Sequence, residues 1–133
     1  MEEPIVYVDT SEVRTGRLND LKLAMGDLVR FVDANEPRLV AYNVYFNEDG
    51  TRMTVLHISP DSAALEHHMR VAGAKFPPIR EFIRMLSIDL YGRPDAGLVE
   101  QVQRKAEMLG TGTVRVHDLM AGFARLQGRL ESA

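Results

Sequence analysis

Two adjacent histidines, His67 and His68, are the side chains in this sequence best suited to acid–base chemistry, because an imidazole gains and loses a proton near neutral pH. His68 continues an apolar helical stripe, whereas His67 is rotated by about 100° around the same helix. The stripe consists of Ala64, Leu65, Val71 and Ala72. The spacing therefore predicts that His68 points into the protein and that His67 lies on a solvated face.

Tyr42 is the second candidate for chemistry, since it shares its strand face with Val40 and Val44. If this face lies under the helix of His68, the phenol and the imidazole line one apolar pocket, which is the usual form of a small-molecule site. The expected apolar walls of that pocket are Leu65, Ala72 and Val44. In the alternative interpretation, His68 is a structural histidine bonded to a backbone carbonyl, and Tyr42 fills the core.

Residue types and spacing disfavour other kinds of site. The chain has no cysteine, which excludes a disulfide framework, a thiolate metal site and a cysteine nucleophile. Adjacent histidines on a helix diverge, so we expect no metal site at His67 and His68. The sequence also lacks a Gly-rich phosphate loop and a nucleophile elbow, and we expect no cofactor.

The composition is typical of a soluble globular domain, with 133 residues, 45% of them hydrophobic and 26% charged, and a net charge of −3. Lys and Arg form no stripe, so nucleic acid is not expected as a partner. No apolar run approaches the roughly 20 residues of a membrane helix. The acidic start Met1-Glu2-Glu3-Pro4 is unlike a secretory signal, and we expect a cytoplasmic protein.

Alternating and periodic patterns predict the elements that position these side chains. Strands are expected at 5–12, 39–46, 53–59, 85–91 and 113–119, and helices at 18–35, 60–74 and 95–109. Ser59-Pro60 is the expected start of the second helix, and Gly50 closes the acidic turn of a hairpin. This order predicts an α+β, ferredoxin-like antiparallel sheet in one domain, 1–133. Its core spans about 4–91, and an extra helix and strand follow at about 95–125.

A ferredoxin-like sheet carries helices on one face only, so strand parity predicts two different surfaces. Under the helices we expect Val6, Val8, Val40, Val44, Phe46, Leu56, Ile58, Leu86, Ile88 and Leu90. On the opposite face we expect Tyr7, Asp9, Asn43, Tyr45, His57, Ser87 and Asp89, together with Ile5, Leu39, Met53, Val55 and Met85. The apolar members of this second set are too many to leave in water. We therefore expect a homodimer that covers this face, with His57 and Asp9 at its interface.

Several segments in this order resemble the antibiotic biosynthesis monooxygenase family. They are Val13-Arg14-Thr15-Gly16, Glu36-Pro37, Tyr42-Asn43-Val44-Tyr45, and Ser62-Ala63-Ala64-Leu65 followed by His68. The resemblance implies a dimeric α+β barrel. It also implies cofactor-independent oxygenation of a small phenolic or quinol compound, with His68 and Tyr42 in proton-handling or positioning roles.

The chain departs from the family pattern at three places. Asn43 stands where the family commonly has an acidic residue, and the tryptophan often found before the second helix has no counterpart. Related haem-degrading enzymes use a haem-ligating histidine further along this helix, where the chain instead reaches Pro77-Pro78, so haem is not expected. The first two departures favour the alternative of a non-catalytic superfamily member, or of one that binds a small apolar or aromatic ligand.

Overall fold

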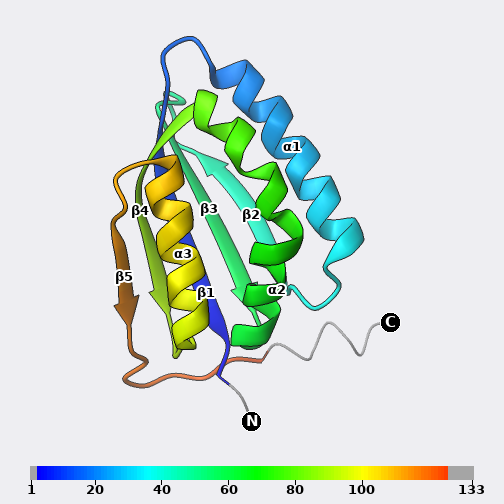
Figure 1. Cartoon of the computed structure of the whole chain (residues 1–133), viewed down its shortest axis with the longest axis vertical. Coiled ribbons are helices and arrows are strands. Elements are labelled where there is room, and N and C mark those ends of the chain that lie inside the picture. Colours follow the sequence, from blue (N-terminus) through cyan, green and yellow to red (C-terminus); the bar gives the residue numbers. More distant parts are fainter. Residues whose placement is uncertain (1–2, 126–133) are drawn as a thin grey trace.

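A five-stranded sheet with three helices on one face makes up the computed structural model, which describes residues 3–125 (Figure 1). The elements are β1 Ile5–Val13, α1 Leu18–Asn35, β2 Ala41–Phe46, β3 Arg52–Ser59, α2 Ser62–Ala72, β4 Ile83–Tyr91, α3 Ala96–Leu109 and β5 Val114–His117. Two short 3₁₀ turns, η1 Gly73–Lys75 and η2 Pro77–Glu81, join α2 to β4. None of the helices between residues 3 and 125 is long and apolar enough to cross a lipid bilayer.

The strand order is β2-β3-β1-β4-β5, with β1 between its antiparallel neighbours β3 and β4. This arrangement confirms the predicted ferredoxin-like fold. β5 pairs in parallel with β4 of the same chain, so the sheet is mixed where a purely antiparallel one was expected. The predicted fifth strand therefore lies on its own sheet edge, and α3 makes the crossover that a parallel pair requires.

The second helix begins two residues later than the Ser59-Pro60 pattern predicts. Ser59 ends β3, and α2 begins at Ser62. Asp61 is the N-cap residue, and its Oδ1 accepts a hydrogen bond from the backbone N–H of Ala64 at 2.9 Å. A carboxylate in this position satisfies a free amide of the first turn, which explains why the chain stays extended through Asp61.

The assignment of the two sheet faces was wrong for β1, β3 and Met85 of β4, whereas Ile88 and Leu90 of β4 are buried as predicted. The helices cover one face of the sheet (Figure 1). The buried residues of the strands include Ile5, Tyr7, Asp9, Met53, Val55, His57 and Met85. In the hairpin, Phe46 pairs with Met53 and Tyr42 pairs with His57. Residues directly opposite each other share a face, so β3 buries the set that was expected at a dimer interface. Tyr42, Val44 and Phe46 do pack against the core as predicted.

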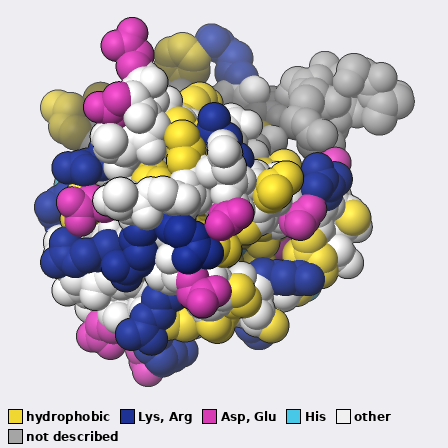
Figure 2. Space-filling view, turned by 90° about the horizontal axis from the view of Figure 1, so that it is seen from above, with side chains coloured by type: hydrophobic (Ala, Val, Ile, Leu, Met, Phe, Trp, Pro, Cys, Tyr) yellow, Lys and Arg dark blue, Asp and Glu magenta, His cyan; other side chains and the backbone are white. Residues whose placement is uncertain are grey.

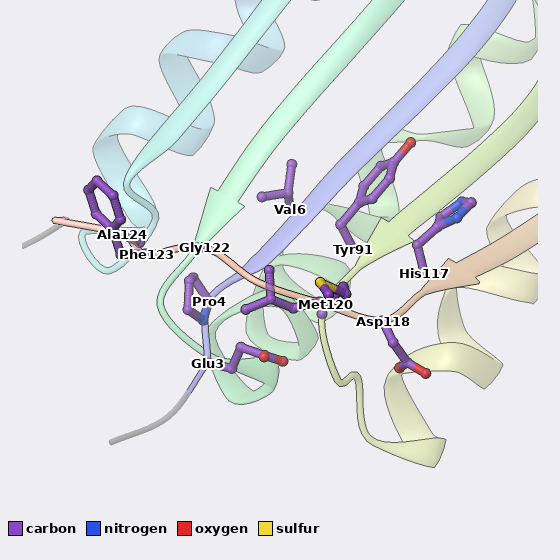
Figure 3. A pocket seen from close by; sticks show the side chains of 12 residues that line it. Glu3, Pro4, Val6, Tyr91, His117, Asp118, Met120, Gly122, Phe123 and Ala124 are labelled. Carbon is purple, nitrogen blue, oxygen red and sulfur yellow. The ribbon is translucent and has the colours of Figure 1, made fainter.

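The uncovered face carries Val6, Val8, Leu56 and Ile58, which are only partly buried. At one end of this face, Tyr91 and His117 stack with ring centroids 4.5 Å apart. The chain after β5 runs across the end of the sheet (Figure 1), and Met120 and Phe123 join Val6 and Tyr91 around a hollow of about 330 Å³ (Figure 3). The outer face is therefore apolar, but through a different set of residues from the predicted one.

Opposite charges are interspersed on the end of the molecule that carries the β1–α1 turn (Figure 2). Glu12, near the end of β1, forms ion pairs with Arg52 at 3.8 Å and Arg84 at 3.3 Å. All three side chains are substantially exposed, and pairs of this kind contribute little to stability. This end therefore presents a mixed polar surface.

Candidate active site

A cluster of polar and aromatic side chains lies between the sheet and the helices. Its members are Tyr7 and Asp9 of β1, Glu36 after α1, Tyr42 of β2, His57 of β3, His68 of α2, Phe76 between η1 and η2, and Lys105 of α3. Charged residues are rarely buried to this extent unless they are paired. The cluster therefore requires close mutual contacts, and it draws on every layer of the fold.

His68 and Glu36 form the first contact within the cluster. Nδ1 of His68 lies 2.8 Å from Oε1 of Glu36, and both residues are buried. A carboxylate only accepts hydrogen bonds, so the proton of a neutral His68 is placed on Nδ1. Burial lowers the pKa of His68, although the hydrogen bond to Glu36 opposes this shift. His68 is therefore a neutral imidazole whose Nε2 carries a free lone pair.

His57 lies in the middle of an aromatic stack. Its ring lies parallel to those of Tyr7 and Tyr42, at centroid distances of 4.2 and 4.3 Å, and meets His68 edge-on at 4.6 Å. Burial, together with the nearby His68 and Lys105, holds the pKa of His57 well below its usual range. Neither ring nitrogen has a hydrogen-bond partner among residues 3–125, which is unusual for a buried imidazole.

Lys105, Tyr7 and Asp9 form a chain of hydrogen bonds. The ammonium group of Lys105 donates to the Tyr7 hydroxyl at 2.7 Å, and this hydroxyl donates to Oδ2 of Asp9 at 2.6 Å. Burial raises the pKa of Asp9, while Lys105 and Tyr7 act in the opposite direction. Burial also lowers the pKa of Lys105 to about 8. The chain thus pairs a buried cation with a buried acid.

Tyr42 lines both an inner cavity and an outer hollow. The inner cavity has a volume of about 20 Å³, enough for one water molecule, and its walls include Asp9, Tyr42, Phe76 and Lys105. The outer hollow, of about 220 Å³, lies beside the end of α1, with Glu36 and Tyr42 in its wall. Tyr42 therefore contributes to the walls of both spaces.

The predicted site residues are found in two different settings. His68 is buried and His67 is exposed, as the helical phase predicts, and the rings of His68 and Tyr42 lie 5.5 Å apart. Leu65 and Ala72 are fully buried core residues, and Val44 packs against that core. The role of these three as walls of a substrate pocket stays a prediction.

The other members of the cluster were not predicted from the sequence. Lys105 could have been found, since the spacing of Leu98, Val102 and Leu109 places it on the buried stripe of α3. Tyr7, Asp9 and His57 were assigned to the wrong face of the sheet. A hairpin register that pairs Phe46 with Met53 also pairs Tyr42 with His57, and it would have placed His57 on the same face as Tyr42. Glu36 was recognised only in the dipeptide Glu36-Pro37 that resembles the family's helix end, and nothing in the sequence indicated its contact with His68.

Groups of metal ligands were not expected, and within residues 3–125 no three His, Asp or Glu side chains are grouped so as to hold a metal ion. The carboxylates of Asp9 and Glu36 are bonded instead to Tyr7 and His68. These bonded carboxylates, together with the imidazoles and the ammonium group, are suited to proton transfer and to the binding of polar or aromatic ligands.

Solved structures share this architecture. MupZ from Pseudomonas fluorescens aligns over 94% of this chain and 91% of its own, with a TM-score of 0.72 and 15% identity. A candidate antibiotic biosynthesis monooxygenase from Bacteroides thetaiotaomicron aligns over 65% and 85%, with a TM-score of 0.59 and 16% identity. This chain has the fold of the antibiotic biosynthesis monooxygenases.

A third similar structure is SnoaB from Streptomyces nogalater, a cofactor-independent oxygenase. It aligns over 71% of this chain and 96% of its own, with a TM-score of 0.59 and 13% identity. Comparisons with protein-family profiles and with curated proteins find no match. At these levels of identity the likeness establishes the fold, as the sequence resemblance implied, and leaves the reaction to be argued from the site.

Proposed function

We propose that this protein is a cofactor-independent monooxygenase acting on a small phenolic or quinol compound, with His68 as the general base. The state of His68 is the observation that supports the proposal most directly. Its Nδ1 is bonded to Glu36, and its Nε2 is buried without a partner among the described residues. An imidazole held in this way keeps a lone pair ready to accept a proton.

The proposed reaction needs no external reductant. His68 takes the proton when the phenolic O–H bond breaks, and the electron-rich phenolate then reacts with dioxygen. A ring carbon of the phenolate bonds to dioxygen, and the peroxide that forms takes the first proton back from His68. His68 then removes the hydrogen of that carbon as a proton while the O–O bond breaks. One oxygen atom stays on the carbon as a quinone oxygen, and the other leaves as hydroxide, which takes up the second proton and becomes water. The substrate supplies all the electrons, so the cluster has only to move protons, hold the ring and exclude bulk water.

Tyr42 is the proposed entrance to the site. A substrate ring would enter from the hollow of about 220 Å³, in whose wall Tyr42 and Glu36 lie. Displacing the Tyr42 ring would open the inner cavity, which Met25, Met53 and Met85 also line. Methionine side chains adapt readily to irregular ligands, so this space can widen without movement of the sheet.

Oxygen uptake tests the proposal. The purified protein is mixed with a panel of simple phenols, hydroquinones and naphthols, and dissolved oxygen is followed with an electrode. We expect uptake with at least one compound, and His68→Ala should lower its rate by roughly 10² to 10⁴ because general-base catalysis is lost. His67→Ala, which changes the exposed neighbour, is the matched control and should react at the unmodified rate.

A second candidate function is the binding of a small ligand without turnover. It is favoured by the inner cavity, which at about 20 Å³ holds no aromatic ring as it stands. In that case a phenol would bind without oxygen uptake, and His68→Ala would change stability rather than rate. Full activity in a folded His68→Ala protein would overturn the assignment of the base.

A further inference from the structure

Lys105 is a buried cation that the proposed reaction has not yet used. It lies on α3 with 6% of its surface exposed. Its ammonium group lies 4.1 Å from the centre of the Phe76 ring and 4.7 Å from that of Tyr7. Burying a lysine is costly even with such cation–π contacts and a nearby carboxylate. An apolar side chain at this position on the buried face of α3 would cost less free energy to bury.

The surroundings of Lys105 are arranged for more than a simple ion pair. Its nitrogen is 3.9 Å from the nearest Asp9 oxygen, and the Tyr7 hydroxyl bridges the two groups. Oδ1 of Asp9 has no hydrogen-bond partner within the part of the chain that the structure describes. Lys105, Asp9 and Tyr42 also share the wall of the inner cavity. The ammonium group of Lys105 has three N–H donors and uses one of them on Tyr7 within the described residues. A cation with spare donors therefore borders the space that the substrate is proposed to enter.

We propose that the ammonium group of Lys105 binds an anionic oxygen at the inner cavity and so holds the ligand as a phenolate or enolate. This inference rests on the proposed function and adds to it the group that would stabilise the ionised hydroxyl of the substrate. When the substrate O–H bond breaks, the proton passes to Nε2 of His68. The negative oxygen that remains is stabilised by the ammonium group of Lys105.

The electrostatics of the cluster fit this role. Burial lowers the pKa of Lys105 to about 8 while Asp9 opposes the shift, so the ammonium form still predominates at neutral pH. Preorganised donors act strongly on developing charge where water is excluded. Burial holds the pKa of His57 well below its usual range. His57 therefore stays neutral and does not compete with Lys105 for the anionic oxygen.

Binding of para-nitrophenol tests the inference apart from turnover, because this electron-poor phenol resists oxidation and its phenolate absorbs visible light. Titrating the bound probe with acid and base measures its ionisation on the protein. We expect the unmodified protein to bind the phenolate at least tenfold more tightly than the neutral phenol. Equal affinity for both forms, or no binding of either, would overturn the inference.

The variants separate charge from structure. Lys105→Met combined with Asp9→Asn removes both charges of the buried pair, so that neither group is left alone, and it should abolish the preference for phenolate. Lys105→Arg should retain part of it. Arg104→Met changes the exposed neighbour, which pairs with Glu100 on the surface, and should bind like the unmodified protein. A phenolate preference that survives in the folded double variant would refute the role of Lys105.

The two proposals fail in different ways. Phenolate binding that depends on Lys105, without oxygen uptake from any phenol, would refute the monooxygenase and leave the anion site standing. Oxygen uptake that depends on His68, without preference for the phenolate, would refute the anion site alone.

Discussion

At the level of single residues, the bond between Glu36 and His68 makes a prediction that needs no substrate. Glu36 raises the pKa of His68 against the effect of burial. Glu36→Gln keeps an oxygen that can accept the Nδ1 proton but removes the charge, so the pKa of His68 should fall further. Nuclear magnetic resonance titration of the imidazole measures it, and a higher pKa in the variant would contradict the assignment.

Glu36→Ala should act on stability instead. It leaves the N–H of a buried imidazole without an acceptor, which costs about 1–3 kcal/mol. Glu36→Gln should cost less, since it preserves the hydrogen bond. Urea denaturation of the two variants compares them directly, and equal losses would mean that the charge matters more than the bond.

Lys105 predicts a dependence of stability on pH. Its pKa falls from the ordinary 10.5 to about 8 in the folded state. Between these values the unfolded chain binds more protons than the folded one, so the free energy of unfolding should rise from about pH 8 to about pH 10. The contribution is on the order of 3 kcal/mol, and below about pH 8 it is absent because lysine is charged in both states.

Two tyrosines set the upper limit of the pH range over which the free energy of unfolding should rise. Burial raises the pKa of Tyr7 and Tyr42, so ionisation of the unfolded chain above about pH 10 works against folding. Urea denaturation at several pH values should show the rise below that point. The rise in the free energy of unfolding should be much weaker in the double variant Lys105→Met, Asp9→Asn. An unchanged rise in that variant would assign the pH dependence to other groups.

The sequence could predict only part of the site at this scale. Helical phase was sufficient for His68 and His67, because three and four residue spacings fix one direction on a helix. Phase alone could not place Tyr7 or Asp9, since both faces of the sheet are apolar and either parity looked suitable for burial. Mutual hydrogen bonding makes their burial tolerable, and those partners are distant in sequence, as with Tyr7 and Lys105, 98 residues apart.

At the level of elements, the end of α3 packs closely against the backbone of β4 at Gly110. A Cβ atom at Gly110 would lie 1.9 Å from the backbone oxygen of Met85, which also accepts a hydrogen bond from Thr111. Gly110→Ala should therefore force α3 and β4 apart and cost about 1–3 kcal/mol or more. Thermal unfolding measures the loss.

Gly73, at the end of α2, is the matched control for this substitution. Its backbone is helical, and a Cβ atom there would meet nothing within 4 Å. Gly73→Ala should be neutral or should stabilise the protein by about 0.4–1 kcal/mol. Similar losses in both variants would show that close approach at Gly110 is not the cause.

Element order and approximate bounds followed from periodicity, because each helix and strand carries its pattern locally. The direction of β5 did not, since its parallel pairing with β4 depends on how α3 crosses the sheet. The start of α2 was misplaced for a local reason: both Ser59 and Asp61 are suitable N-cap residues, and only Asp61 accepts the amide of Ala64.

At the level of the whole molecule, the outer sheet face leads to a revised prediction of a homodimer. Val6, Val8, Leu56 and Ile58 present the apolar surface there, and a second copy is the partner we expect to cover it. Leu56→Glu should produce a monomer in light scattering at micromolar concentration. Leu23→Glu, at an apolar position on α1 that is 71% exposed, should leave association unchanged. A monomeric unmodified protein would refute the dimer.

The buried cluster also links the site to the order in which the chain folds. Tyr7 and Asp9 belong to the first strand, while the cation that accompanies them comes from the last helix. Closing so long a segment is entropically costly and tends to slow folding. During synthesis, Lys105 leaves the ribosome after Asp9, so the counter-ion from α3 reaches Asp9 late. The wall of the inner cavity is thus completed only when α3 packs against the sheet. A chain truncated before α3 would leave the carboxyl group of Asp9 without its cation.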